Sequence, residues 1–159
     1  MSYVTDLRAL IGHQPLILNG SCVLLFNAQQ QLLLQQRAEP QARWGLLGGL
    51  MELGESTRDV VLREVQEESD LILETDKLQF INTYSGPDHR AVAPNGDIFY
   101  SVISAYAYQP VTEQPQVNDQ ESQQFQWYAL TDLPTNLVAS HRQIIQDYCA
   151  AQQIDLHKN

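Results

Sequence analysis

The alternation of apolar and polar residues along the chain predicts a protein built mainly from strands. The apolar, β-branched segment Pro15–Phe26 and the triplet Leu32–Leu34 flank the polar turn Asn27–Gln30, which predicts a two-stranded hairpin. Three further strands are predicted at residues 78–84, 98–108 and 125–130, because turn-forming clusters of Gly, Pro, Asn and Asp separate apolar runs there.

Three segments have apolar residues at helical spacing instead. They predict a short leading helix at 3–11, a last helix at 140–151, and a central helix at 56–69 with Ser56 as its N-cap and Asp59 in a shortened capping box. Hairpins with one helix inserted midway and one at the end favour an α+β fold, with a mixed β-sheet sandwiched between helices.

Composition narrows the range of functions. Acidic residues outnumber basic ones 19 to 9, and the formal charge of −10 argues against duplex nucleic acid as a partner. An acidic protein that binds a phosphate ester needs cations or a few placed arginines and lysines to neutralise the phosphates. The two cysteines lack ligand-like spacing, and neither a cleavable signal pattern nor a bilayer-spanning apolar run is recognisable. We therefore expect a cytoplasmic protein that does not bind membranes.

The central helix carries the candidate chemistry. At about 100° per residue, it places Glu64, Glu67 and Glu68 within one arc, away from the apolar face. Like charges at this spacing destabilise a helix by a few tenths of a kcal/mol per pair, and a bound hard cation would reverse that effect. Carboxylate ligands suit magnesium or manganese. On its own, the pattern also fits a solvated acidic helix face.

A longer array extends this pattern in both directions. It consists of Gly49, Glu55, Arg63, Glu64, Val65, Glu67, Glu68 and Leu71. The stretch from Gly49 to Leu71 resembles the Nudix box, G-x5-E-x7-R-E-U-x-E-E-x-G-U with U an aliphatic residue, at every defined position but one. Trp44 and the pair Gly48–Gly49 are similar to the segment that commonly leads into this box. The resemblance covers roughly residues 17–151 and implies the Nudix fold.

Two positions depart from the family pattern. Asp70 stands where the box has its final glycine, at a helix end where that glycine adopts a left-handed conformation. Asp tolerates this conformation better than most residues, so we expect a cost of about 1 kcal/mol in stability and no loss of chemistry. Leu47 replaces the proline that many members have before the glycine pair, which changes loop stiffness but removes no functional group.

The resemblance implies a role for each box residue. The implied cation ligands are Glu64, Glu67, Glu68 and the carbonyl oxygen of Gly48. Arg63 and Glu55 are similar to the pair that holds these acids in place. A Mg²⁺ or Mn²⁺ cofactor would polarise phosphate oxygens and lower the pKa of an attacking water.

Three residues outside the box are weaker candidates. Glu121 lies in a loop before the last predicted strand and is similar to a glutamate that some members use as a metal ligand or general base; the alternative is a solvated carboxylate. Whether Glu64 or Glu121 is the base stays open. Arg37, after the second strand, resembles an arginine that some members direct at a substrate phosphate; the alternative is a surface arginine. Arg90 is a further candidate for substrate binding, in the loop 85–97 that we expect to border the pocket.

The whole chain, 1–159, is thus expected to be a single Nudix hydrolase domain with a short N-terminal helical extension. The implied function is that of a metal-dependent pyrophosphohydrolase acting on the diphosphate linkage of a small-molecule nucleoside-diphosphate-type substrate. Nucleoside triphosphates, nucleotide sugars, ADP-ribose, dinucleoside polyphosphates and dihydroneopterin triphosphate all stay open, and so does a homodimer. The alternative is a non-catalytic nucleotide-binding or sensing module on the same fold. Such relatives usually lose box acids, which this chain retains.

Overall fold

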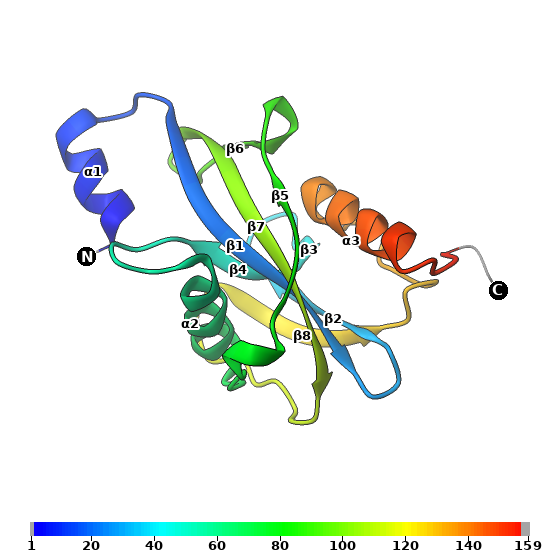
Figure 1. Cartoon of the computed structure of the whole chain (residues 1–159). Helices are drawn as coiled ribbons and strands as arrows, with labels where there is room; N and C mark the ends of the chain where they lie inside the picture. Colours follow the sequence, from blue (N-terminus) through cyan, green and yellow to red (C-terminus); the bar gives the residue numbers. More distant parts are fainter. Residues whose placement is uncertain (1, 157–159) are drawn as a thin grey trace.

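The computed structural model describes residues 2–156 and shows a mixed sheet with helices on its two faces (Figure 1). The helices are α1 (Tyr3–Ile11), α2 (Thr57–Ser69) and α3 (Ala139–Ala151), with short 3-10 turns at Thr75–Lys77 and Pro87–His89. The strands are β1 (Leu16–Asn27), β2 (Leu32–Arg37), β3 (Trp44–Gly45), β4 (Leu47–Leu50), β5 (Gln79–Tyr84), β6 (Arg90–Val92), β7 (Ile98–Val111) and β8 (Ser122–Tyr128).

The two longest strands, β1 and β7, run parallel at the centre of the sheet. β2 and β4 pair antiparallel with β1, while β5 and β6 pair antiparallel with β7. β8 extends the sheet by pairing antiparallel with β2. These pairings confirm the predicted hairpin and mixed sheet. The sequence did not predict β6, since its three residues lie in a segment dominated by turn formers.

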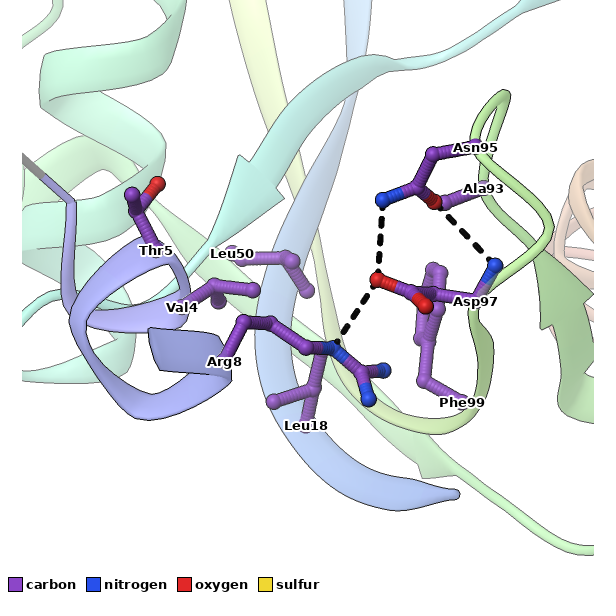
Figure 2. Close-up of a pocket in the computed structure, with 9 residues that line it drawn as sticks. All are labelled: Val4, Thr5, Arg8, Leu18, Leu50, Ala93, Asn95, Asp97 and Phe99. Carbon is purple, nitrogen blue, oxygen red and sulfur yellow. Dashed lines mark hydrogen bonds and ion pairs between the residues drawn. The ribbon is translucent and has the colours of Figure 1, made fainter. Parts of the chain in front are cut away.

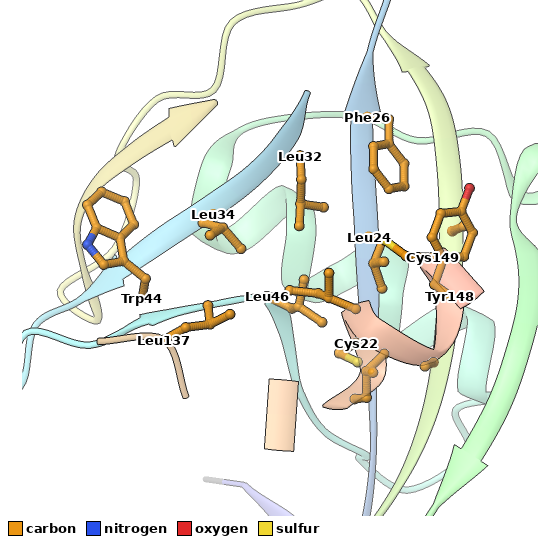
Figure 3. Close-up of a cluster of buried hydrophobic side chains, with 14 of the residues drawn as sticks. Cys22, Leu24, Phe26, Leu32, Leu34, Trp44, Leu46, Leu137, Tyr148 and Cys149 are labelled. Atoms are coloured by element: carbon orange, nitrogen blue, oxygen red, sulfur yellow. The ribbon is translucent and has the colours of Figure 1, made fainter. Parts of the chain in front are cut away.

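The sheet separates two apolar clusters, and the apolar run in β1 contributes to both. Cys22, Leu24 and Phe26 pack with residues of α3, whereas Val23 and Leu25 pack with residues of α2. Successive side chains of a strand point to opposite faces, so a strand covered on both faces needs an unbroken apolar run. Figure 3 shows the α3 side, where Tyr148 stacks on Phe26 with ring centroids 5.3 Å apart.

The central helix α2 begins and ends where the sequence predicts. The Ser56 hydroxyl accepts a hydrogen bond from the backbone N–H of Asp59, and the Asp59 carboxylate accepts one from the backbone N–H of Ser56, which completes the capping box. Asp70 follows the helix with φ 59° and ψ 13°, so the predicted left-handed helix end is confirmed. Buried valines on one side of α2 fix its orientation, and the helix packs against β4 and β1.

The leading helix α1 docks beside the sheet rather than on its core, since none of its residues is buried. Arg8 holds it there through an ion pair with Asp97 at 3.3 Å and a hydrogen bond to the carbonyl of Ile98. The backbone N–H of Tyr3 also donates to Glu52 in the loop before α2, at 2.7 Å. Across residues 2–156 no helix combines the length and apolar character needed to cross a membrane.

Candidate metal centre

The acidic residues of α2 belong to two different clusters. One, the arginine cluster, consists of Arg63 with Glu55, Glu64 and Glu67. The other, the glutamine cluster, consists of Gln35, Glu68, Asp119, Glu121 and Ser122. The three acids predicted to share one arc thus bind different hydrogen-bonding partners. The charge of Glu64 still acts on Glu68, and that of Glu121 acts on Glu64, so the two clusters are neighbours.

Arg63 is the centre of the arginine cluster. Its Nε and Nη2 donate to the two oxygens of Glu55 at 2.5 and 2.9 Å, and its Nη1 donates to Glu64 at 2.7 Å and to Glu67 at 3.3 Å. Nη2 also reaches the carbonyl of Leu50, at 3.0 Å. The hydrogen bond from Arg63 lowers the pKa of Glu55. The two residues that the resemblance pairs are thus in contact, with a guanidinium fork matched to a carboxylate.

The glycine pair before α2 makes room for the acidic side chains. A Cβ on Gly49 would lie 2.2 Å from a carboxylate oxygen of Glu64, and a Cβ on Gly48 would lie 2.2 Å from the carbonyl oxygen of Ser21 on β1. Gly48 also has a φ of 147°, which side chains rarely adopt. The glycines therefore let β4 pass close to both β1 and the Glu64 carboxylate. Burial raises the pKa of Glu64.

Glu68 is the buried acid of the glutamine cluster, with 5% of its surface exposed. Its Oε1 accepts a hydrogen bond from the Gln35 amide at 3.0 Å, and its Oε2 accepts one from the backbone N–H of Gly48 at 3.3 Å. Both donors are neutral, and burial raises the pKa of Glu68 to about 8. One carboxylate oxygen each from Glu68, Asp119 and Glu121 lie within 4.8 Å of one another.

The glutamine cluster has the donor set of a hard divalent cation. Three carboxylates this close repel one another, and within residues 2–156 no cationic side chain forms an ion pair with any of them. Only oxygen ligands are offered, as magnesium and manganese prefer. The residues fit such an ion, which would supply the counter-charge that the fold does not provide.

Of the predicted ligands, Glu68 lies in this group, whereas Glu67 has 58% of its side chain exposed and contacts Arg63 instead. Glu121 lies in the predicted loop, directly before β8, and it is exposed. Gly48 reaches the group through its N–H, which donates to Glu68. The ligand role of its carbonyl oxygen stays a prediction.

The two arginines proposed for substrate binding lie in different places. Arg37 ends β2 opposite Ser122, and the next residue, Ala38, donates its N–H to the carbonyl of Glu121 at 2.7 Å. Arg90 is exposed on β6 and belongs to neither cluster. Among the arginines and lysines of residues 2–156, these are the two whose side chains form no hydrogen bond or ion pair. The charge of Arg37 nevertheless acts on the neighbouring Glu39 carboxylate.

Sequence reasoning missed Gln35, Asp119 and Ser122. Gln35 directly continues the buried run of β2 and has 4% of its surface exposed, so a polar residue at the end of an apolar strand was the available signal. Asp119 accepts hydrogen bonds from the backbone N–H groups of Glu121 and Ser122, at 3.2 and 3.0 Å. The position of Asp119 beside Glu68 depends on long-range packing that no local sequence pattern predicts.

A cleft away from the glutamine cluster lies between α1 and the turn before β7 (Figure 2). It measures about 300 Å³, and Leu18, Leu50 and Phe99 form its apolar wall. Asn95 and Asp97 of the loop 85–97 line this cleft, and that the loop borders the substrate pocket stays a prediction. None of the glutamates proposed as cation ligands lines it.

Comparison with known proteins identifies relatives over most of the chain. Residues 18–148 match the model of the NUDIX domain. A Bacillus subtilis protein named uncharacterized Nudix hydrolase YvcI is 30% identical over 138 residues, which are 86% of this chain and 81% of that protein. The crystal structure of a MutT NUDIX hydrolase from Burkholderia pseudomallei superimposes with a TM-score of 0.68 at 26% identity, covering 84% of this chain and 98% of that one.

Two further similarities concern proteins whose ligands or activities are named. The NUDIX domain of Shewanella oneidensis NrtR, solved with ADP ribose, has a TM-score of 0.65 at 21% identity and covers 98% of this chain and 100% of that one. An Escherichia coli isopentenyl-diphosphate Delta-isomerase is 32% identical over 114 residues, 69% of this chain. The chain spans only about 60% of the length of that relative.

Proposed function

The chain belongs to the Nudix family of hydrolases, and we propose that it uses a divalent cation to hydrolyse the diphosphate linkage of a nucleoside-diphosphate-type substrate. The observation that carries the proposal is the glutamine cluster, in which a buried glutamate and two neighbouring carboxylates meet only neutral donors. A protein of net charge −10 needs local positive charge to bind a diphosphate, and a cation in this cluster provides it.

In this proposal Glu68, Asp119 and Glu121 hold the cation. When bound, the cation supplies charge neutralisation to phosphate oxygens and makes a water molecule more acidic. Arg37 is the side chain we assign to a second phosphate of the substrate. It is half-buried, its side chain forms no hydrogen bond or ion pair within residues 2–156, and it pairs in the β2–β8 ladder with Ser122, which follows Glu121.

We assign the general base to Glu64. Its Oε1 accepts from Arg63, so the carboxylate is held in one orientation, while its half-buried position raises its pKa and makes it a better proton acceptor at neutral pH. Water attacks one phosphorus and gives its proton to Glu64, the bond from that phosphorus to the bridging oxygen breaks, and the leaving phosphate takes up the negative charge. Arg63 and Glu55 keep Glu64 in place throughout.

The test is hydrolysis of a diphosphate panel with the products identified. Nucleoside triphosphates, nucleotide sugars, ADP-ribose and dinucleoside polyphosphates would be assayed with Mg²⁺ or Mn²⁺ and again with excess EDTA. We expect turnover of at least one substrate that stops with chelator. Full activity in EDTA would contradict the mechanism, and tight nucleotide binding without turnover of any substrate would favour a sensing module.

A second candidate function comes from the similarity to isopentenyl-diphosphate isomerases. Isopentenyl diphosphate would therefore be added to the panel, with both phosphate release and double-bond migration measured. Hydrolysis and isomerisation both require a bound diphosphate, and a cation in the glutamine cluster would bind it equally well for either reaction. We favour hydrolysis because the acids of the Nudix box are all retained. Migration of the double bond without phosphate release would reverse this preference.

A further inference from the structure

Gln35 of β2 joins α2 and β8 within the glutamine cluster. Its Nε2 donates one hydrogen bond to Glu68 of α2 at 3.0 Å and another to the hydroxyl of Ser122 at 2.7 Å. Both bonds are buried, and they use both N–H groups of the amide. An ionised carboxylate accepts hydrogen bonds only, so the amide nitrogen has to face Glu68.

An irregularity in the sheet brings Ser122 to this position. Gln36 of β2 pairs with Gln124 of β8, but the next pair is Arg37 with Ser122, which leaves Gln123 as an extra residue. Side chains alternate between faces, so Ser122 would otherwise point to the opposite face from Gln35. The bulge thus turns the start of β8, and with it Glu121, toward the acid of α2.

Backbone hydrogen bonds also join the loop before β8 to the end of α2. Asn118 donates its N–H to the carbonyl of Glu68 at 3.1 Å, and Gln116 donates to the carbonyl of Ser69 at 2.9 Å. These bonds fix where the loop starts but not how its carboxylates face Glu68. The Gln35 bonds are the side-chain contacts that join Glu68 to the residue following Glu121.

We propose that Gln35 is a positioning residue for the cation: its amide sets the spacing of Glu68 from the Asp119–Ser122 turn, so that three carboxylates can share one ion. The inference rests on the proposed function, which supplies the cation. Gln35 touches neither substrate nor ion in this role. An amide suits it because both of its hydrogens are used as donors, whereas a glutamate at the same place would add a fourth carboxylate to the group.

The test is Mn²⁺ affinity, measured by electron paramagnetic resonance on the full chain without any substrate. Gln35→Met keeps the length of the side chain and removes both donors. We expect its Mn²⁺ dissociation constant to rise by about 10- to 100-fold, the range found when groups that orient metal ligands are removed. Gln36→Met is the matched control, because Gln36 is the neighbouring glutamine on the same strand and bonds instead to Ala42 and Gln124. Its affinity should stay within about twofold of the wild type.

Ser122→Ala covers the case in which Gln35→Met does not fold. It releases one amide hydrogen and keeps the bond to Glu68, so Mn²⁺ affinity should fall by a smaller factor, about 3- to 10-fold. Unchanged affinity in a folded Gln35→Met, or in Ser122→Ala if the former is unfolded, overturns the positioning role while leaving the proposed function intact. A wild-type chain that binds no Mn²⁺ overturns both, and an equal loss in Gln36→Met overturns the positioning role alone.

Discussion

The arginine cluster and the glutamine cluster both contain acids of α2, but the carboxylates of the first bind a cationic side chain and Glu68 of the second binds neutral donors. In the arginine cluster, one guanidinium binds three carboxylates, with donor–acceptor distances from 2.5 to 3.3 Å. In the glutamine cluster, the amide of Gln35 and the backbone N–H of Gly48 are the groups that bond to Glu68. The pKa of Glu55 is lowered by Arg63, whereas burial raises that of Glu68 to about 8.

This difference distinguishes supporting acids from cation ligands, two roles that the spacing of acids in the sequence does not distinguish. A carboxylate with its own arginine is charged and fixed without help, which suits a supporting group. For a buried carboxylate with neutral donors, the fold provides no counter-charge and disfavours the ionised form, which suits a ligand whose counter-charge arrives with the cofactor. Four predictions test whether the two clusters divide the work in this way, and a fifth tests the helix end that follows them.

The largest effect is expected for Glu68→Gln. The substitution keeps the size of the side chain but removes a charge from the cation ligands, so turnover should fall on the order of 100-fold or more and Mn²⁺ affinity should fall with it. Steady-state kinetics across a manganese titration measures both. An enzyme of normal activity would overturn the assignment of the whole site.

Glu64→Gln and Glu121→Gln should then lose activity for different reasons. If Glu64 is the base, its substitution lowers kcat by about 100-fold while Mn²⁺ affinity is nearly kept, because a positioned proton acceptor contributes about that much. Glu121→Gln should instead weaken Mn²⁺ binding. The opposite pattern, with affinity lost in Glu64→Gln and kept in Glu121→Gln, would transfer the role of base to Glu121.

Arg63→Lys should have an intermediate effect. Lysine keeps the charge but loses the planar fork that serves Glu55 and Glu64 together, so kcat should fall by about 10-fold or more. Mn²⁺ affinity should change less than in Glu68→Gln. If the lysine variant loses Mn²⁺ affinity as completely as Glu68→Gln, the two clusters are one site and the comparison fails.

Acid pH should weaken the arginine cluster through Glu55. Its pKa in the fold is lower than its ordinary value of 4.5, so its contribution to stability is present above that pH and is lost as the pH falls through the folded value. The difference in unfolding free energy between wild type and Glu55→Gln should therefore shrink below pH 4.5. Urea unfolding from pH 6 to pH 3.5 measures it, and a constant difference would exclude this linkage.

The smallest effect is expected for Asp70→Gly. Asp70 has a φ of 59°, and glycine adopts this conformation at lower cost, so the substitution should stabilise the fold by up to about 1 kcal/mol with little change in rate. Thermal unfolding and steady-state kinetics check the two parts. An unchanged or lower melting temperature would show that the Asp70 side chain compensates for its backbone strain.

The sequence by itself determined the local features of this protein. The apolar segment Pro15–Phe26 identified the strand β1, Ser56 and Asp59 identified the start of α2, and the family pattern at Asp70 identified its left-handed end. The box residues identified the family, which the match over residues 18–148 confirms. All of these depend on neighbours within a few positions, where spacing along the chain decides geometry.

Tertiary structure alone decided which acids meet. Helical spacing placed Glu64, Glu67 and Glu68 in one arc, but the packing of α2 against β1 and β4 buried Glu68 and left Glu67 exposed beside Arg63. Gln35 and Asp119 reached Glu68 from positions 33 and 51 residues away, through strand pairing and a bulge in β8. Contacts at such separations depend on the register of the whole sheet, which no local pattern of residues encodes.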